Sequence, residues 1–311
     1  MVTVNVSAVG RVSLARGLPV TITLDKNLED VTVADVKAAV ATKFPRFYAS
    51  RQKLTLKGER KALADEITLK DTGLSDGGEL TVKDLGAQLG WRTVYVIEYA
   101  GPLIIHPLIY NYPRFWYGAL VPKSMLQKMV FGLVLAHFIK RELETIYVHR
   151  FSHGTMPFSF VFRNSAHYWV LSGFLLAAAV YSPTYDNYAQ YVRGSLRDNP
   201  RFLWSCAALW LFAELSNLYA HLTLRSLRPE GTKTRSIPYG YGFALVSCPH
   251  YFFEIISWVA IAAMTGSYAA WFFVAVSTYI LAMWALKRHK AYRKEFKEYP
   301  RERKAIFPFI L

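Results

Sequence analysis

Residues 267–286, SYAAWFFVAVSTYILAMWAL, form an apolar stretch with no charged side chain, and the basic segment KRHKAYRK follows directly at 287–294. A helix that crosses a bilayer needs about 20 mainly apolar residues. The cytosolic ends of membrane helices carry an excess of Lys and Arg. This stretch therefore predicts a membrane-spanning helix whose carboxyl end faces the cytosol.

Five more apolar stretches precede this one in the chain. They cover residues 91–111, 125–147, 166–182, 202–224 and 241–264. Six spans place both chain ends on the same side of the membrane, and the basic tail identifies that side as the cytosol. The sequence predicts a multi-pass α-helical membrane protein with about six transmembrane helices, or seven if the proline-rich region 102–122 re-enters the bilayer.

Composition and charge support this class of protein. Apolar residues make up 53% of the 311 residues and charged residues only 19%. Residues 1–85 hold 13 Lys and Arg against 11 Asp and Glu, a net charge of +2, whereas residues 86–311 hold 24 against 11, a net charge of +13. Because these cations separate apolar runs, they indicate membrane topology and argue against nucleic-acid binding. The two cysteines, Cys206 and Cys248, lie in apolar stretches and no metal-binding spacing occurs, so no metal site is expected.

The first 86 residues have the pattern of a small soluble domain. Strand-like alternation at 2–6 and 20–24 is followed by apolar residues at helical spacing over 33–40, and short strands are predicted at 53–56 and 80–82. This order is similar to a ubiquitin-like α+β (β-grasp) fold. The first 20 residues lack the apolar core of a signal peptide, so the domain is expected to stay in the cytosol. Residues 87–311 then form the membrane domain.

Polar residues inside the apolar stretches are the functional signal, because ionisable groups in a span are costly and usually face a cavity or a partner. Glu98 lies in the first stretch, and Tyr251 and Glu254 lie three residues apart in the fifth. Asn217 and His221 share one helix face with Glu214 in the fourth. For Glu98 the alternative is a carboxylate that snorkels or pairs with a basic residue. For the stripe of Glu214, Asn217 and His221 it is hydrogen bonding between packed helices, and for Tyr251 and Glu254 it is a structural role.

Four longer motifs resemble one protein superfamily. SCPHYFFEIISW at 247–258 and KRHKAYRKEF at 287–296 are similar to the signatures of the steroid 5α-reductase superfamily. LETIYVHRFSHGTMP at 143–157 and EYAGP at 98–102 resemble its very-long-chain trans-2-enoyl-CoA reductases, which also carry an N-terminal ubiquitin-like domain. One departure is His250, which stands where the superfamily commonly has Asn.

The resemblance implies an NADPH-dependent reduction of a trans-2-enoyl-CoA to the saturated acyl-CoA, the last step of the fatty-acid elongation cycle on the endoplasmic reticulum. It implies that Tyr251 donates the proton and that Arg150 and Glu98 position the substrate carbonyl or tune that donor. The implied NADPH-site residues are Asn217, His221, Arg228, Arg235, His250, Glu254, His289 and Tyr292. Besides the enoyl-CoA and the bilayer, other enzymes of the elongation cycle are expected partners.

Three other functions remain open at this point. A steroid or polyprenol reductase of the same superfamily would use the same cofactor, but the HRFSH stretch at 149–153 and the ubiquitin-like domain speak against it. An isoprenylcysteine methyltransferase would use S-adenosylmethionine, whereas the cationic loop at 225–235 suits NADPH. A non-enzymatic membrane scaffold would leave the polar residues within the spans without a role.

Overall fold

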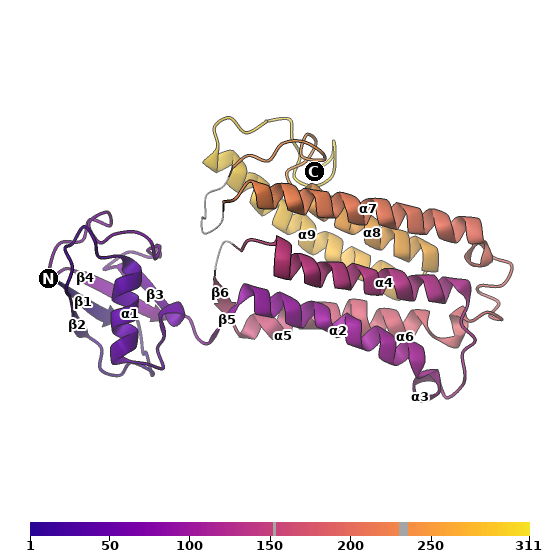
Figure 1. The fold of residues 1–311 in the computed structure, drawn as a ribbon, viewed down its shortest axis with the longest axis horizontal. Coiled ribbons are helices and arrows are strands. Elements are labelled where there is room, and N and C mark those ends of the chain that lie inside the picture. Colours follow the sequence, from indigo (N-terminus) through magenta and orange to yellow (C-terminus); the bar gives the residue numbers. More distant parts are fainter. Residues whose placement is uncertain (152–153, 230–235) are drawn as a thin grey trace. The chain divides into compact units, whose positions relative to one another are not determined.

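A computed structural model describes residues 1–151, 154–229 and 236–311 (Figure 1). The chain divides into two compact units. One comprises Met1–Gly90 together with a short segment that ends at Phe160, and the other comprises the helices that begin at Trp91.

The N-terminal unit contains a four-stranded sheet and one helix. Its elements are β1 (Val2–Ala8), β2 (Val20–Leu24), α1 (Val33–Lys43), η1 (Ala49–Arg51), β3 (Gln52–Leu56) and β4 (Glu79–Asp84). The strand order is β2-β1-β4-β3, with β1 and β4 parallel and the two outer pairs antiparallel. Two hairpin strands, a helix and a central parallel pair are the predicted β-grasp arrangement.

Local sequence explains why these elements form where they do. Val2, Val4 and Val6 alternate with half-buried polar residues along β1, so one face of the sheet joins the core. Thr32 begins α1 by accepting a hydrogen bond from the Asp35 N–H, and the Asp35 carboxylate accepts one from the Thr32 N–H in return. This reciprocal cap satisfies two amide groups that the first helical turn leaves without partners.

A second, two-stranded sheet was not predicted. β5 (Gln88–Gly90) pairs antiparallel with β6 (Thr155–Pro157), and the Phe158 N–H donates to the Ala87 carbonyl at 2.8 Å. Sequence reasoning missed these strands because each has three residues, too few to show an alternating pattern. The pairing fastens the segment between the second and third predicted spans to the chain that precedes the first.

In the described ranges six long helical segments follow, and each overlaps one of the six predicted spans. They are α2 (Trp91–Asn111), α4 (Met125–Leu143) with the π-helical turn η2 (Glu144–Val148), the run of α5 (Ser159–Ser165), η3 (Ala166–Leu175) and α6 (Leu176–Val180), α7 (Pro200–Ser226), α8 (Pro249–Thr265) and α9 (Tyr268–Glu295). The shorter connecting helices are α3 (Pro113–Tyr117), η4 (Pro183–Tyr185) and η5 (Leu196–Asp198).

The fifth predicted span, 241–264, is wrong at its start, because α8 begins only at Pro249. The residues just before α8 are held by the end of the chain instead. The Ser247 and Cys248 N–H groups donate to the carbonyls of Lys304 and Ala305 at 2.8 and 3.1 Å. This pairing satisfies the backbone outside a helix, and Pro249 then supplies a favourable first helical position.

By length and composition, α9 is the one helix in the described ranges that is apolar enough to cross a membrane. The count of about six spans therefore stays a prediction. α4 and α7 carry buried polar side chains, which lower their hydropathy, whereas the third segment is divided by the π-helical turn η3 and α8 has only 17 residues. Their apolar side chains nevertheless pack against one another in a shared core.

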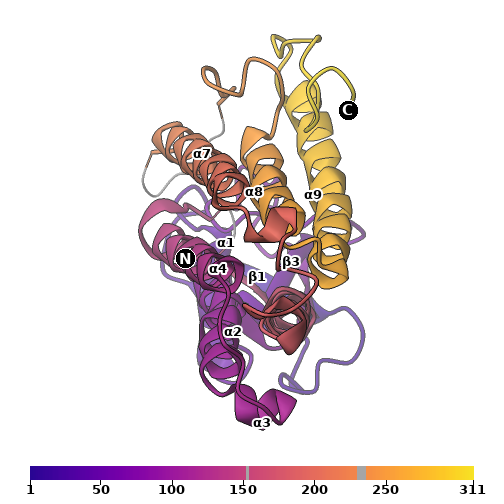
Figure 2. The same cartoon turned by 90° about the vertical axis from the view of Figure 1, so that its right-hand side faces the viewer.

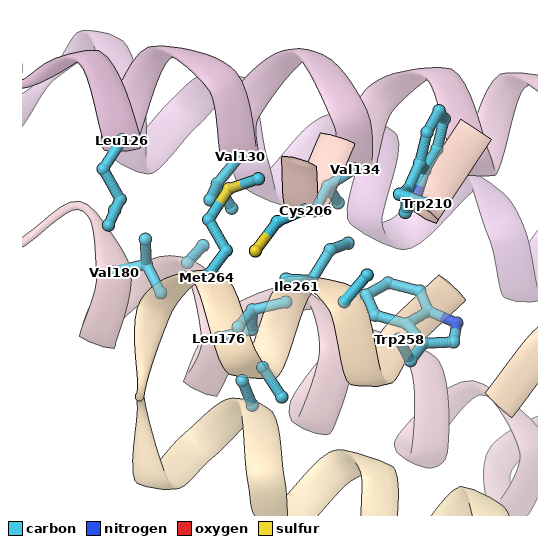
Figure 3. Packing of buried hydrophobic residues seen from close by; sticks show 14 of the residues in the cluster. Leu126, Val130, Val134, Leu176, Val180, Cys206, Trp210, Trp258, Ile261 and Met264 are labelled. Atoms are coloured by element: carbon cyan, nitrogen blue, oxygen red, sulfur yellow. The ribbon is translucent and has the colours of Figure 1, made fainter. Parts of the chain in front are cut away.

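The helices pack lengthwise around a shared apolar core, and α7, α8 and α9 lie in sequence beside one another (Figure 2). Figure 3 shows the contributions of α4, α7 and α8 to this core through Val130, Cys206 and Ile261. A close approach occurs where Gly101 of α2 meets the ring of Trp169, because a Cβ at Gly101 would collide with that ring. The Trp169 indole N–H donates to the Ile97 carbonyl at 3.0 Å and fixes this contact.

We predict that the Asp84–Arg51 ion pair makes the stability of the N-terminal unit depend on pH. Burial opposes ionisation of Asp84, but hydrogen bonds from Arg51 and the Gly86 N–H outweigh it and lower the pKa of the carboxyl. A lowered folded-state pKa stabilises the fold above the unfolded pKa of about 4, and this contribution is lost as the pH falls through the folded value.

Residues 1–90 expressed alone should therefore lose stability to urea as the pH falls below about 4, and Asp84→Asn should be less stable at pH 7 with a shallower acid dependence. Asp71→Asn, which changes an exposed carboxyl, is the control. An unchanged acid dependence in Asp84→Asn would contradict the assignment.

Candidate functional site

Buried polar side chains gather where α4, α7 and α8 meet. On α4 and the π-helical turn that follows it, His137, Lys140, Arg141 and Glu144 recur at spacings of three and four residues. Side chains at this spacing share one helix face. The carboxyl ends of α4, α7 and α9 lie at the same end of the helical unit in Figure 1.

The core of the cluster is His137, held between two carboxylates. Its Nδ1 lies 2.7 Å from Glu214 Oε1 on α7, and its Nε2 lies 3.3 Å from Glu254 Oε1 on α8. A carboxylate can only accept, so both contacts are hydrogen bonds only when both ring nitrogens carry a proton. The arrangement therefore favours the imidazolium form of His137.

Lys140 and Asn217 extend this network across the helices. The Lys140 ammonium lies 2.9 Å from Glu214 Oε2 and donates to Asn217 Oδ1 at 2.6 Å. The Asn217 amide N–H₂ group then donates to the His250 carbonyl at 2.8 Å and to Glu254 Oε2 at 3.1 Å. Asn217 thus connects a cation on α4 with the beginning of α8.

Arg141 joins the cluster to α2. One guanidinium nitrogen donates to Glu144 Oε2 at 2.6 Å, and another donates to the Tyr99 hydroxyl at 3.0 Å. Glu144 Oε1 lies 3.1 Å from His221 Nδ1. With His137 protonated, three cations face Glu144, Glu214 and Glu254, so the charges balance inside a buried region.

Tyr251 and His250 occupy the first turn of α8 beside this network. Their rings lie 4.2 Å apart between centroids, and the Tyr251 ring also faces Trp284 of α9 at 6.4 Å. Within the described residues, the Tyr251 hydroxyl has no hydrogen-bond partner, and the buried Nδ1 of His250 has none either. These two polar atoms are available to a ligand.

The other predicted site residues form two separate groups. Arg150 and Arg228 exchange hydrogen bonds with each other's backbone, with Arg228 Nη1 at 2.6 Å from the Arg150 carbonyl. His289 shares a 2.6 Å hydrogen bond with the hydroxyl of Ser247, and Tyr292 stacks on Tyr299 with centroids 5.4 Å apart. Arg235 lies outside the described residues.

Glu98 is buried on α2, one residue before Tyr99, and its Oε1 has no partner in the described part of the chain. The Asn164 side chain lies beside this carboxyl. The structure thus brings Asn217, His221, His250 and Glu254 together, and it places Tyr251 next to them. It links Arg150 to Arg228 rather than to Tyr251 or Glu98 through any described contact.

Sequence reasoning assigned no role to four polar residues on the second helical segment: His137, Lys140, Arg141 and Glu144. The signal was present, since these four follow the same spacing that drew attention to Glu214, Asn217 and His221. The α7 side chains that share hydrogen bonds with His137, Lys140 and Arg141 lie 77 to 80 residues away in the chain, which no local pattern reveals.

A cation site is conceivable at Glu144, His149 and His221, whose ligand atoms lie within 4.8 Å of one another. Arg141 Nη1, however, lies 2.6 Å from Glu144 and 3.4 Å from His221 Nδ1. A guanidinium at this position repels a metal ion and already satisfies the carboxylate. The geometry therefore describes an ion-pair centre more closely than a metal site.

Both parts of the chain match known proteins. Residues 154–311 match the family described as 3-oxo-5-alpha-steroid 4-dehydrogenase. Residues 19–84 match the domain described as "TECR, ubiquitin-like domain".

Several curated proteins are similar over most of the chain. A putative enoyl reductase of Schizosaccharomyces pombe is 47% identical over 250 residues, 80% of this chain and 82% of that protein. The very-long-chain enoyl-CoA reductase of Dictyostelium discoideum is 38% identical over 73% of this chain and 72% of its own length. A probable very-long-chain enoyl-CoA reductase of Caenorhabditis elegans is 36% identical over 93% of this chain and 94% of its own length. The chain therefore belongs to the 3-oxo-5-alpha-steroid 4-dehydrogenase family and carries an N-terminal ubiquitin-like domain.

Proposed function

We propose that the protein reduces very-long-chain trans-2-enoyl-CoA to saturated acyl-CoA with NADPH, as the last step of the fatty-acid elongation cycle. The observation that carries the proposal is the half-buried Tyr251 hydroxyl, which lacks a described partner and lies beside a balanced cluster of buried charges. The relatives above are named as enoyl reductases, which favours this substrate over a steroid, although the family's description names steroids.

The residues around His250 fit a nucleotide cofactor. The buried Nδ1 of His250 has no partner in the described ranges, and a ribose hydroxyl or an amide would satisfy it. In our proposal Asn217, His221, His250 and Glu254 hold the nicotinamide end, while Arg228, Arg235, His289 and Tyr292 hold the phosphates and the adenosine. Bound NADPH would supply a hydride to the β-carbon of the enoyl group.

The protein's own groups would then handle the charge and the proton. Negative charge develops on the thioester oxygen, and donors aimed at that oxygen lower the barrier. The half-buried Arg141 guanidinium and the buried Tyr99 hydroxyl it contacts are such donors, and Arg150 and Glu98 are proposed to position the carbonyl. The Tyr251 hydroxyl is proposed to donate the proton to the α-carbon.

The cellular setting is part of the same proposal. Residues 1–86 would form a cytosolic ubiquitin-like domain, and residues 87–311 the catalytic domain with about six spans. Both chain ends would face the cytosol from the endoplasmic reticulum membrane, near the other enzymes of the elongation cycle. The basic carboxyl end of α9 supports this orientation.

The decisive experiment supplies the purified protein with a trans-2-enoyl-CoA and follows NADPH consumption together with formation of the saturated acyl-CoA. A steroid enone in a parallel reaction tests the main alternative within the family. Turnover of the steroid without turnover of the enoyl-CoA would refute the proposed substrate.

We predict that Tyr251→Phe lowers turnover at least about 100-fold while NADPH binding persists, because the variant keeps the ring and removes only the proton donor. Binding and turnover should be measured on the same sample. Tyr279→Phe, which changes an exposed tyrosine on α9, should behave like the unmodified protein. Normal turnover in Tyr251→Phe would assign the proton to another group.

A second prediction concerns Arg141. Arg141→Lys keeps the positive charge but loses the planar fork that reaches Glu144 and Tyr99 together, so kcat/KM should fall by about tenfold or more. Lys128→Arg, near the beginning of α4, exchanges the same two residue types away from the cluster and serves as the control. If Arg141→Lys retained full activity, charge alone would explain the role of this position.

The third prediction is that NADPH is preferred over NADH, since the proposed phosphate ligands include Arg228. Arg228→Ala should raise the KM for NADPH about tenfold with a smaller effect on the KM for NADH. Arg193→Ala, an exposed arginine in a different connecting segment, is the control. Equal use of the two nucleotides by the unmodified protein would exclude a 2′-phosphate site.

A further inference from the structure

A cavity of about 260 Å³ lies at the carboxyl end of α9 and is lined by Arg293, Phe296, Lys297, Tyr299 and Arg301. Its one connection to the side-chain groups described above is Tyr299, on which Tyr292 stacks. Pockets that hold a whole drug-sized ligand have volumes of roughly 300–1,000 Å³. The volume therefore suits one end of a larger molecule.

Three cations face this cavity without a counter-charge. Arg293, Lys297 and Arg301 are exposed, and none of them forms an ion pair with any carboxylate that the structure describes. Like charges brought to one concavity repel one another and raise the local concentration of anions. An anionic ligand that contacts all three would relieve this repulsion, and Arg prefers phosphate because of its fork of donors.

The floor of the cavity is fixed by its neighbours. The Tyr299 hydroxyl shares a 2.6 Å hydrogen bond with Ser247, and the Tyr299 ring is stacked on Tyr292 at an interplanar angle of 7°. The buried Arg303 guanidinium lies 4.9 Å from the centroid of the same ring. Tyr299 is therefore buried at 4% exposure, and the half-buried Phe296 is the aromatic side chain of the lining that remains for a flat base next to the cations.

The position of the cavity relates it to the proposed reaction centre. Tyr251 faces Trp284 on α9, and Arg293 lies nine residues further along the same helix. At a rise of 1.5 Å per residue this separation is about 13 Å along the helix axis. The pantetheine arm of CoA is a long flexible chain that separates the thioester from a diphosphate and a 3′-phosphorylated adenosine.

We propose that this cavity binds the 3′-phosphoadenosine end of the CoA substrate, an inference that rests on the function proposed above. The phosphates contact Arg293, Lys297 and Arg301, and the adenine lies against Phe296. The cations proposed for NADPH, Arg228 and Arg235, come from the segment between α7 and α8. The two nucleotides therefore use separate groups of cations.

The test compares two double variants of equal charge and spacing in the full-length protein. Arg293→Ala/Lys297→Ala removes two cations that line the cavity, and Lys290→Ala/Lys294→Ala removes two exposed cations of α9 that do not. Calorimetry measures binding of adenosine 3′,5′-bisphosphate, which reproduces the end of CoA, without any turnover. The lining variant should bind it at least about tenfold more weakly, and the control variant should stay within about threefold.

Kinetics with an enoyl-CoA and its dephospho form identify the phosphate. In the unmodified protein, removal of the 3′-phosphate should raise KM about tenfold at similar kcat. In the lining variant the two substrates should have nearly equal KM values, because the same interaction is already absent. The proposal would be overturned if both double variants lost the same affinity for adenosine 3′,5′-bisphosphate. It would also be overturned if the lining variant bound adenosine 2′,5′-bisphosphate more weakly but bound the 3′,5′ isomer as the unmodified protein does. Failure of enoyl-CoA reduction in the unmodified protein would refute the function, while the binding measurement would still decide the cavity.

Discussion

The contact on which the helical unit depends is that of His137 with Glu214 and Glu254. It joins α4, α7 and α8 through one imidazolium, and Lys140 adds a second cation to Glu214. Charges removed from water are costly unless each is paired and hydrogen-bonded. Removal of either cation would leave a buried carboxylate with too few partners, so the relative positions of these helices are closely constrained.

That constraint positions the proposed reaction centre. Asn217 is oriented by Lys140 on one side and by Glu254 on the other, and its remaining donor holds the His250 carbonyl in the first turn of α8. Tyr251 is the next residue, so its direction follows from the same network. The Tyr99 hydroxyl is held through Arg141 in a comparable way. The charge cluster thus supports polar groups that a substrate or cofactor would contact.

Several features were predictable because they depend on local patterns. The alternation at 2–6 and 20–24 identified the first hairpin, and apolar runs located the helical segments. The pattern failed at 241–248, where the chain turns and residues 245–248 pair with the end of the chain instead of forming a helix. It also gave no indication of β5 and β6, whose partners lie far apart in the sequence.

The sequence by itself determined that Glu214, Asn217 and His221 share a helix face, because helical periodicity follows from residue spacing alone. It also determined the apolar character of α9 and the basic segment that follows it. Only the tertiary structure decided that this face meets His137, Lys140 and Glu144, that Arg150 contacts Arg228, and that three cations surround one cavity. The physical reason is that ion pairs and cavities depend on distances between helices, which arise from packing of the whole bundle and not from any single segment.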